Sequence, residues 1–329
     1  QRLQRHVFAA EAALVGRLWH PNIVRIHDAV ADADPPYIVM EYVPGATLRS
    51  YCRADRLLPL EQIVEIGFKC ALALDHVYRQ GVIHRDIKPA NILAKLDGER
   101  LVDVKVSDFG SAFISAADST QIHRVGSLAY MSPEQIEGEA LDCRTDIYSL
   151  AATLYHLVAG RPPFDGPHQQ AVMVQVLGAE PPPLAPLRDG VPAHLESLLR
   201  ASMAKSREDR PASWMDFAKA LSAVVADHEV PRAEAEAVLD SERFNLLRGL
   251  PFFADFGDVA LWEVVHRASW RRWAAGAAIY RRGDRDNAFH IVAEGEIEVW
   301  RGGSCVARVG PGSSVGEMAY LAPDPALRT

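Results

Sequence analysis

The sequence predicts an α+β fold in two domains, with a larger domain of mixed helices and strands followed by a smaller β-roll. A length of 329 residues suits two domains of roughly 150 residues each, and 49% hydrophobic residues are sufficient to form their cores. Before about residue 225, apolar residues recur mostly at helical spacing, with short strands between them. After about Gly276 the pattern changes to short alternating runs separated by glycines, which is typical of a small β-roll or barrel.

The first domain is expected to begin with one helix and two antiparallel strands. Apolar residues recur at near-helical spacing over residues 7–18, and the turn His20-Pro21-Asn22 interrupts the pattern. Residues 23–27 and 37–42 are short and β-rich, and a stretch with Asp and Pro separates them. We therefore expect these two strands to pair.

Two longer helices follow in the same domain. Residues 60–80 carry apolar side chains on one face, and Gly81 provides a stop signal for that helix. Residues 147–157 are apolar nearly all round, which predicts a helix buried inside the domain rather than lying on its surface. We place the first domain at residues 1–225, and the charged, Ala-rich residues 226–241 are expected to form a helical connector.

The second domain is expected at residues 242–329. Residues 289–292 and 296–300 are short alternating runs, and glycines separate them from their neighbours. That alternation predicts strands with one face inside a β-roll.

Composition excludes some classes of partner. Lys and Arg total 35 and Asp and Glu total 43, which gives a formal net charge of −8 without a basic tract for nucleic acid or an anionic membrane. The sequence has neither a run of about 18 apolar residues nor a signal-peptide pattern, so we expect no membrane segment within it. The four cysteines are scattered without metal-ligand spacing, which indicates a reducing, cytoplasmic location.

An ordered series of polar motifs lies in the first domain. His84-Arg85-Asp86-Ile87-Lys88-Pro89-Ala90-Asn91 is followed by Asp108-Phe109-Gly110 and then by Ser132-Pro133-Glu134. The first triplet alone would fit a surface loop, but the whole series in order resembles the protein kinase family, and bacterial eukaryotic-like serine/threonine kinases in particular. The resemblance implies a two-lobed kinase fold that lacks the start of its N-lobe.

The resemblance also implies roles for four residues. Asp86 would accept or orient the proton of the substrate hydroxyl, and Lys88 would steady the transferring phosphate. Asn91 and Asp108 would hold two magnesium ions through oxygen ligands. A lysine two residues after the catalytic aspartate is the serine/threonine pattern, so the implied reaction is transfer of the γ-phosphoryl group of ATP to Ser or Thr hydroxyls of a protein substrate.

Two further resemblances concern ATP binding. Glu11 matches the glutamate that pairs with the ATP-binding lysine, although an exposed helix glutamate would look the same. The lysine and the glycine-rich loop would precede Gln1, so we expect the chain as given to bind ATP poorly. Residues 41–44 match the hinge of the family, which places backbone groups of Glu41 and Val43 against the adenine. The alternative is that these residues are simply the end of a strand.

Arg85 beside the catalytic aspartate resembles kinases that are activated by phosphate in the activation loop. The candidate phosphorylation sites are Ser115, Ser119 and Thr120, and each could equally be an exposed loop hydroxyl. The sequence alone does not choose among them.

Other motif residues have structural counterparts in the family. Ser127 stands where a threonine is usual, and we expect its hydroxyl to contact Asp86. Glu134 and Arg210 match a buried ion pair, and Asp146 matches an aspartate that anchors the catalytic loop from the buried helix.

The second domain resembles a cyclic-nucleotide-binding domain. Its ligand cassette would be Gly316, Glu317, Met318 and Ala319, followed by Arg328 and Thr329. The resemblance implies that an arginine pairs with the cyclic phosphate and a glutamate with the ribose hydroxyl of cAMP or cGMP. The spacing from Glu317 to Arg328 is slightly long for the family, and it contains two prolines.

Two alternatives from other functional classes stay open at this point. The chain could be a pseudokinase scaffold or a cyclic-nucleotide sensor without catalysis, or its second domain could serve only for docking. An upstream lysine and glycine-rich loop would favour the enzyme, and direct nucleotide titration would separate a sensor from a docking module.

Overall fold

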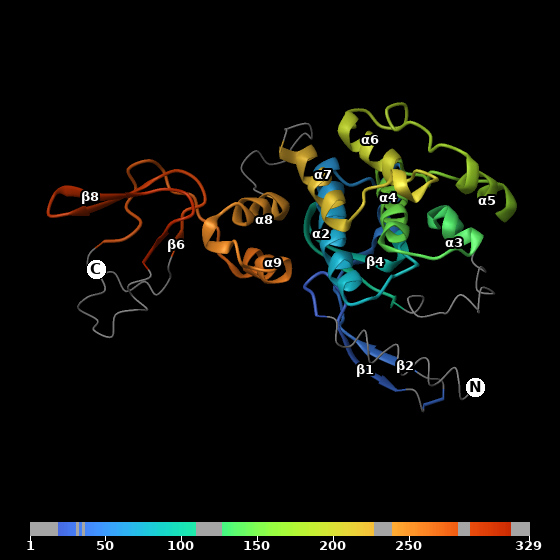
Figure 1. The fold of residues 1–329 in the computed structure, drawn as a ribbon, viewed down its shortest axis with the longest axis horizontal. Coiled ribbons are helices and arrows are strands. Elements are labelled where there is room, and N and C mark those ends of the chain that lie inside the picture. Colours follow the sequence, from blue (N-terminus) through green and yellow to red (C-terminus); the bar gives the residue numbers. More distant parts are fainter. Residues whose placement is uncertain are drawn as a thin grey trace. The chain divides into compact units, whose positions relative to one another are not determined.

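A computed structural model describes residues 19–30, 33–34, 37–109, 127–226, 239–281 and 290–316 (Figure 1). The chain divides into two compact units, Gln1–Ala237 and Val238–Thr329. The helix predicted over residues 7–18 and most of the connector predicted over residues 226–241 lie outside the described residues.

Two small antiparallel sheets are described in the first unit. Strands β1 (Ile26–Val30) and β2 (Tyr37–Met40) form one, and β3 (Ala46–Thr47), β4 (Ile92–Asp97) and β5 (Arg100–Val106) form the other in that order. The predicted pairing of the first two strands is confirmed, but β1 begins later than residue 23. Ile23 bridges Val106 instead, and the Val24 N–H donates to the Val106 carbonyl at 2.9 Å, because the backbone there joins the β5 side.

Helix α2 (Leu60–Arg79) confirms the helix predicted over residues 60–80, and it runs through the middle of the first unit (Figure 1). Its apolar face is buried, and Gly81 with φ of 78° follows the helix end. Gly67 permits close packing, because a Cβ there would lie 2.7 Å from Leu154 Cδ1 and 3.0 Å from Leu221 Cδ1. Helix α2 therefore packs tightly between α4 (Cys143–Ala159) and α7 (Trp214–Ala226).

Helix α4 is the buried helix that the sequence predicts. Asp142 caps its N-terminus by accepting from the Arg144 N–H at 2.8 Å, and Gly160 ends it with φ of 71°. Ile147, Leu150 and other residues on several sides of the helix are 0% exposed. Polar side chains near the ends of α4 contact the loops of the site that is described below.

The remaining elements of the first unit are short. The helices are α3 (Pro133–Glu137), α5 (Gln169–Gly178) and α6 (Ala193–Ser202). The 3₁₀ helices are η1 (Leu48–Tyr51), η2 (Pro89–Asn91), η5 (Leu128–Tyr130) and η6 (Arg207–Asp209).

The second unit has a helical and a strand part. Its helices are α8 (Asp240–Arg248), η7 (Pro251–Phe253) and α9 (Asp258–Arg267). Strand β6 (His290–Ile291) pairs with β9 (Ser314–Val315), and β7 (Ile297–Arg301) pairs with β8 (Ser304–Val309). The edge-to-face contact of Phe244 with Trp262, whose ring centroids are 5.5 Å apart, joins α8 to α9. Glycine-separated strands occur where the alternation predicts them.

Among the helices of the described residues, none is both long and apolar enough to cross a lipid bilayer.

Candidate active site

The loop of residues 84–91 follows α2 and is held from α4. Arg85 has φ of 66°, an unfavourable conformation for a residue with a Cβ. The Asp146 carboxylate accepts the backbone N–H groups of His84 at 2.7 Å and Arg85 at 2.8 Å. Burial raises the pKa of Asp146, and these two hydrogen bonds oppose that effect. The anchoring role predicted for Asp146 is confirmed by this geometry.

His84 connects this loop to the one that carries Asp108. Its Nε2 lies 3.0 Å from the Ser107 carbonyl, and its ring packs against Phe109 with centroids 4.6 Å apart. Asp108 itself is exposed and has φ of 64°. A positive φ in a residue other than glycine is costly, and here it turns the Asp108 backbone sharply between the half-buried Ser107 and the buried Phe109.

The Asp86 carboxylate is fixed by two side chains. Lys88 Nζ lies 2.8 Å from Oδ1 and 2.6 Å from Oδ2 of Asp86. Asn91 Nδ2 donates to the Asp86 carbonyl at 2.8 Å and to Oδ2 at 2.9 Å. Charge-assisted hydrogen bonds of this length hold the carboxylate in one orientation.

Asn91 and Asp108 keep side-chain oxygen atoms that are available to bind a metal ion. Because Asn91 uses its amide nitrogen on Asp86, its Oδ1 keeps both lone pairs, and this oxygen has no hydrogen-bond partner in the part of the chain that the structure describes. Within those same residues the Asp108 carboxylate likewise accepts no hydrogen bond. One amide oxygen and one carboxylate suit the hard oxygen chemistry of Mg²⁺.

The stretch after β2 keeps two backbone groups available. The Glu41 N–H donates to the Arg25 carbonyl at 2.8 Å, and its carboxylate lies 3.1 Å from Lys105 Nζ. The Glu41 carbonyl and the Val43 N–H have no hydrogen-bond partner among the described residues. An acceptor and a donor two residues apart are suited to the edge of an adenine base.

The segment before α3 reaches the same loop. Ser127 Oγ accepts from Lys88 Nζ at 3.1 Å, so the contact expected between Ser127 and Asp86 runs through the lysine ammonium. Gln135 Nε2 donates to the Arg85 carbonyl at 2.8 Å. Gln135 also forms a capping box with Ser132 at the start of α3.

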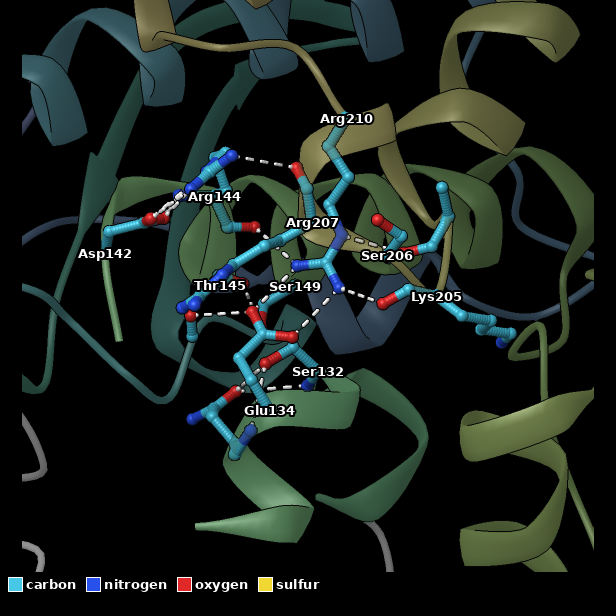
Figure 2. A network of polar contacts seen from close by, with 12 residues as sticks. Ser132, Glu134, Asp142, Arg144, Thr145, Ser149, Lys205, Ser206, Arg207 and Arg210 are labelled. Atoms are coloured by element: carbon cyan, nitrogen blue, oxygen red, sulfur yellow. Dashed lines mark hydrogen bonds and ion pairs between the residues drawn. The ribbon is translucent and has the colours of Figure 1, made fainter. Parts of the chain in front are cut away.

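Figure 2 shows the buried ion pair that the motifs predict. Arg210 Nη1 and Nη2 lie 2.7 Å and 2.9 Å from the two carboxylate oxygens of Glu134, and both side chains are almost completely buried. Burial alone would raise the pKa of Glu134, but the hydrogen bond and charge of Arg210, together with smaller effects of a backbone hydrogen bond and of Thr145, hold that pKa below its ordinary value. Thr145 Oγ1 donates to the same carboxylate at 2.8 Å. The remaining guanidinium hydrogens of Arg210 bind the backbone carbonyls of Arg144, Ala204 and Lys205.

Several predicted site residues lie outside the described residues. They are Glu11 in the first unit, the candidates Ser115, Ser119 and Thr120, and the cassette residues Glu317, Met318, Ala319, Arg328 and Thr329. Gly316 is described, and it follows β9 with φ of 94°, a conformation that favours glycine.

The motif analysis did not assign roles to three residues that support this site. They are Gln135, Thr145 and Lys105, which bind Arg85, Glu134 and Glu41. The Ser-x-x-Gln spacing from Ser132 to Gln135 could have revealed Gln135 as a capping residue. The other two contacts join residues distant in sequence and leave no local signal.

A comparison with protein families matches residues 1–222 to the protein kinase domain. The chain belongs to the protein kinase family. Residues 270–329 of this kinase match the cyclic nucleotide-binding domain. Both resemblances and the predicted fold class are thereby confirmed.

Curated relatives of this kinase come from several bacteria. The chain is 36% identical over 286 residues to serine/threonine-protein kinase PknB of Mycobacterium leprae, which is 82% of the chain and 45% of the relative. It is 39% identical over 223 residues to the probable serine/threonine-protein kinase PknB of Bifidobacterium longum, covering 64% of the chain and 32% of the relative. A probable serine/threonine-protein kinase of Clostridium perfringens is 36% identical over 241 residues. The chain thus spans less than half the length of these relatives.

Proposed function

We propose that the kinase domain transfers the γ-phosphoryl group of ATP to Ser or Thr hydroxyls of a protein substrate. The observation that carries the proposal is the Asp86 carboxylate, which Lys88 and Asn91 hold in one orientation beside the open Oδ1 of Asn91. The relatives' names as serine/threonine-protein kinases support the substrate class.

Each side chain of this cluster has a task in the proposed reaction. Asp86 orients the substrate hydroxyl and accepts its proton, while Lys88 places a positive charge beside it for the developing negative charge. Asn91 Oδ1 and the Asp108 carboxylate would hold magnesium, which when bound neutralises charge on the phosphate oxygens. The Glu41 carbonyl and Val43 N–H would hold the adenine, and Glu11 would pair with an ATP-binding lysine.

The test is phosphate transfer from labelled ATP by the full-length protein, with Asp86→Asn as the variant. Loss of a positioned base lowers rates by about 100-fold or more, and we expect that loss here. Asp189→Asn, which changes an exposed loop carboxylate, is the matched control and should keep full activity. No transfer by a folded, magnesium-supplied wild type would refute the proposal and favour a pseudokinase scaffold.

We propose that phosphate in the activation loop switches this site on. Arg85 precedes Asp86 directly, so a phosphorylated Ser115, Ser119 or Thr120 that paired with its guanidinium would act on the catalytic loop itself. Mass spectrometry of active full-length protein should find phosphate on at least one of these residues, and an active protein with an unmodified loop would contradict the idea.

We propose a cyclic nucleotide, cAMP or cGMP, as the ligand of the second domain. The family match over residues 270–329 and the sharp turn at Gly316 after β9 support it. Calorimetric titration should show binding that Arg328→Ala abolishes, since the cyclic phosphate would lose its charge partner. Arg308→Ala, at an exposed position on β8, is the matched control and should leave binding unchanged. Wild-type protein that binds neither nucleotide would point to a docking module.

We propose boundaries of 1–225 for the kinase domain, 226–241 for the linker and 242–329 for the nucleotide-binding domain. The division into two compact units near residue 237 supports them. We also propose a cytoplasmic location, which is supported by four cysteines that are all free thiols.

A further inference from the structure

One hydrogen bond in the kinase domain has no part in the site described above. Tyr130 Oη lies 2.6 Å from His156 Nδ1, and the two rings are nearly parallel, with an interplanar angle of 15°. Tyr130 ends η5 and is 9% exposed, while His156 lies in the last turn of α4. This short bond joins the segment before α3 to the buried helix.

Both partners are uncharged at neutral pH. Burial lowers the pKa of His156 to about 4, although a hydrogen bond with the Cys52 backbone and the charge of Asp165 act in the opposite direction. Burial, with a smaller effect of Cys52, raises the pKa of Tyr130 far above its ordinary value, and Arg49 opposes this. A neutral imidazole beside a neutral phenol fits a Tyr130 O–H that donates to Nδ1.

The bond is one short step from the proposed catalytic cluster. The Tyr130 N–H donates to the Ser127 carbonyl at 3.1 Å, which closes one 3₁₀ turn. Ser127 Oγ in turn accepts from Lys88 Nζ, and Lys88 binds the Asp86 carboxylate. A change at Tyr130 therefore reaches the Lys88 ammonium through a single turn of backbone.

Helix α4 consequently holds two segments that meet at Lys88. Near its N-terminus Asp146 binds the His84 and Arg85 amides, and near its C-terminus His156 binds Tyr130. Because both anchors lie on one continuous helix, the spacing between them is fixed by its helical geometry.

We infer that Tyr130 and His156 are positioning residues, whose hydrogen bond holds the Ser127 hydroxyl in contact with Lys88. The role in phosphoryl transfer rests on the proposed function, whereas the structural role does not. Neither residue is a catalytic residue, since each acts through Ser127.

The variants separate hydrogen bonding from packing. Tyr130→Phe removes the hydroxyl alone. His156→Asn keeps a polar atom at the position of Nδ1, whereas His156→Gln moves it to the position of Nε2. Tyr148→Phe is the matched control. Tyr148 lies on α4 and is buried like Tyr130, but its hydroxyl has no hydrogen-bond partner among the described residues.

The first readout is steady-state kinetics of the full-length protein. We expect kcat to fall about fivefold in Tyr130→Phe and His156→Gln, which is the value of one neutral hydrogen bond. The KM for ATP should stay unchanged, since neither residue touches the hinge stretch. His156→Asn and Tyr148→Phe should retain kcat near that of the wild type.

The second readout, hydrogen exchange at the Tyr130 and Met131 amides, does not depend on activity. These amides close the η5 turn, so exchange should be faster in Tyr130→Phe and His156→Gln but not in the other two variants. If the wild type transfers no phosphate, the proposed function fails while exchange still decides the positioning role. The inference is overturned if Tyr130→Phe matches Tyr148→Phe in exchange, or if an active enzyme shows equal kcat for both.

Discussion

The two units of this chain hold their strands and loops by different means. In the kinase domain, buried ionic groups fix the loops: Arg210 binds Glu134 and three backbone carbonyls, and Asp146 binds two amides. In the second unit, the β7–β8 hairpin is exposed over most of its length, with Trp300 60% and Val306 58% exposed. The loops of the proposed active site are held by buried polar contacts, whereas the hairpin relies on strand pairing.

Among the variants considered, Arg210→Ala should cause the largest loss of unfolding free energy in the kinase domain. It leaves the Glu134 carboxylate buried without its partner, which typically costs about 3–5 kcal/mol of unfolding free energy. The change in unfolding free energy is measured by urea unfolding, with hydrogen exchange of the α4 amides as the readout. Arg200→Ala is the control, because its ion pair with Glu180 is exposed and worth less than about 1 kcal/mol. Equal losses in the two variants would contradict the importance of the buried pair.

Leu154→Ala tests apolar packing in the kinase core. Leu154 is 0% exposed and lies against Gly67 of α2, so we expect a loss of about 2–5 kcal/mol in unfolding free energy. Val306→Ala on the exposed hairpin should change that free energy by no more than about 0.5 kcal/mol. Chemical denaturation of both variants measures the difference, and a comparable loss at Val306 would show that this hairpin face is covered in solution.

Asp146→Asn should have a smaller but still clear effect. The amide can accept only one of the two N–H groups that the carboxylate binds, and one buried donor left unsatisfied costs about 1–3 kcal/mol. We expect lower stability together with lower phosphate transfer, because the strained Arg85 backbone loses its anchor. Asp209→Asn, an exposed carboxylate, should change neither quantity. Unchanged activity in Asp146→Asn would show that the loop does not need this anchor.

The smallest predicted effect is a pH dependence from His156. Its pKa is lowered in the folded protein to about 4 from an ordinary 6.5, so the unfolded chain takes up this proton first. Stability from this group is therefore complete above pH 6.5 and is lost as the pH falls from 6.5 towards 4. Urea midpoints at pH 7, 6 and 5 should fall less in His156→Asn than in the wild type. His27→Asn, at an exposed histidine, should follow the wild type, and identical slopes in all three proteins would contradict the shift.

Much of this fold was predictable because its signals are local. The apolar face of α2, the all-round apolar pattern of α4 and the glycines after each are properties of short segments, and the structure confirms them. The resemblance to the protein kinase family, which rests on the order of the motifs, likewise implied the Glu134–Arg210 pair and the anchoring by Asp146.

The contacts that the sequence did not predict join distant residues. Ile23 and Val24 look like part of the first strand, yet their backbone joins Val106. Ser127 reaches Lys88 rather than Asp86 directly, and Tyr130 binds His156. No periodicity or spacing in one sequence records which side chain a folded backbone brings within hydrogen-bonding distance.

The sequence by itself determined the family, the two-domain order and the residue types available for phosphoryl transfer, because motif order and periodicity are properties of the chain. Only the tertiary structure decided that Asn91 turns its nitrogen to Asp86 and leaves its oxygen open. It also decided that one buried helix anchors both the loop of residues 84–91 and the Ser127 segment. The physical reason is that hydrogen bonds act over about 3 Å, and residues 26 to 62 positions apart come that close only when the helices have packed.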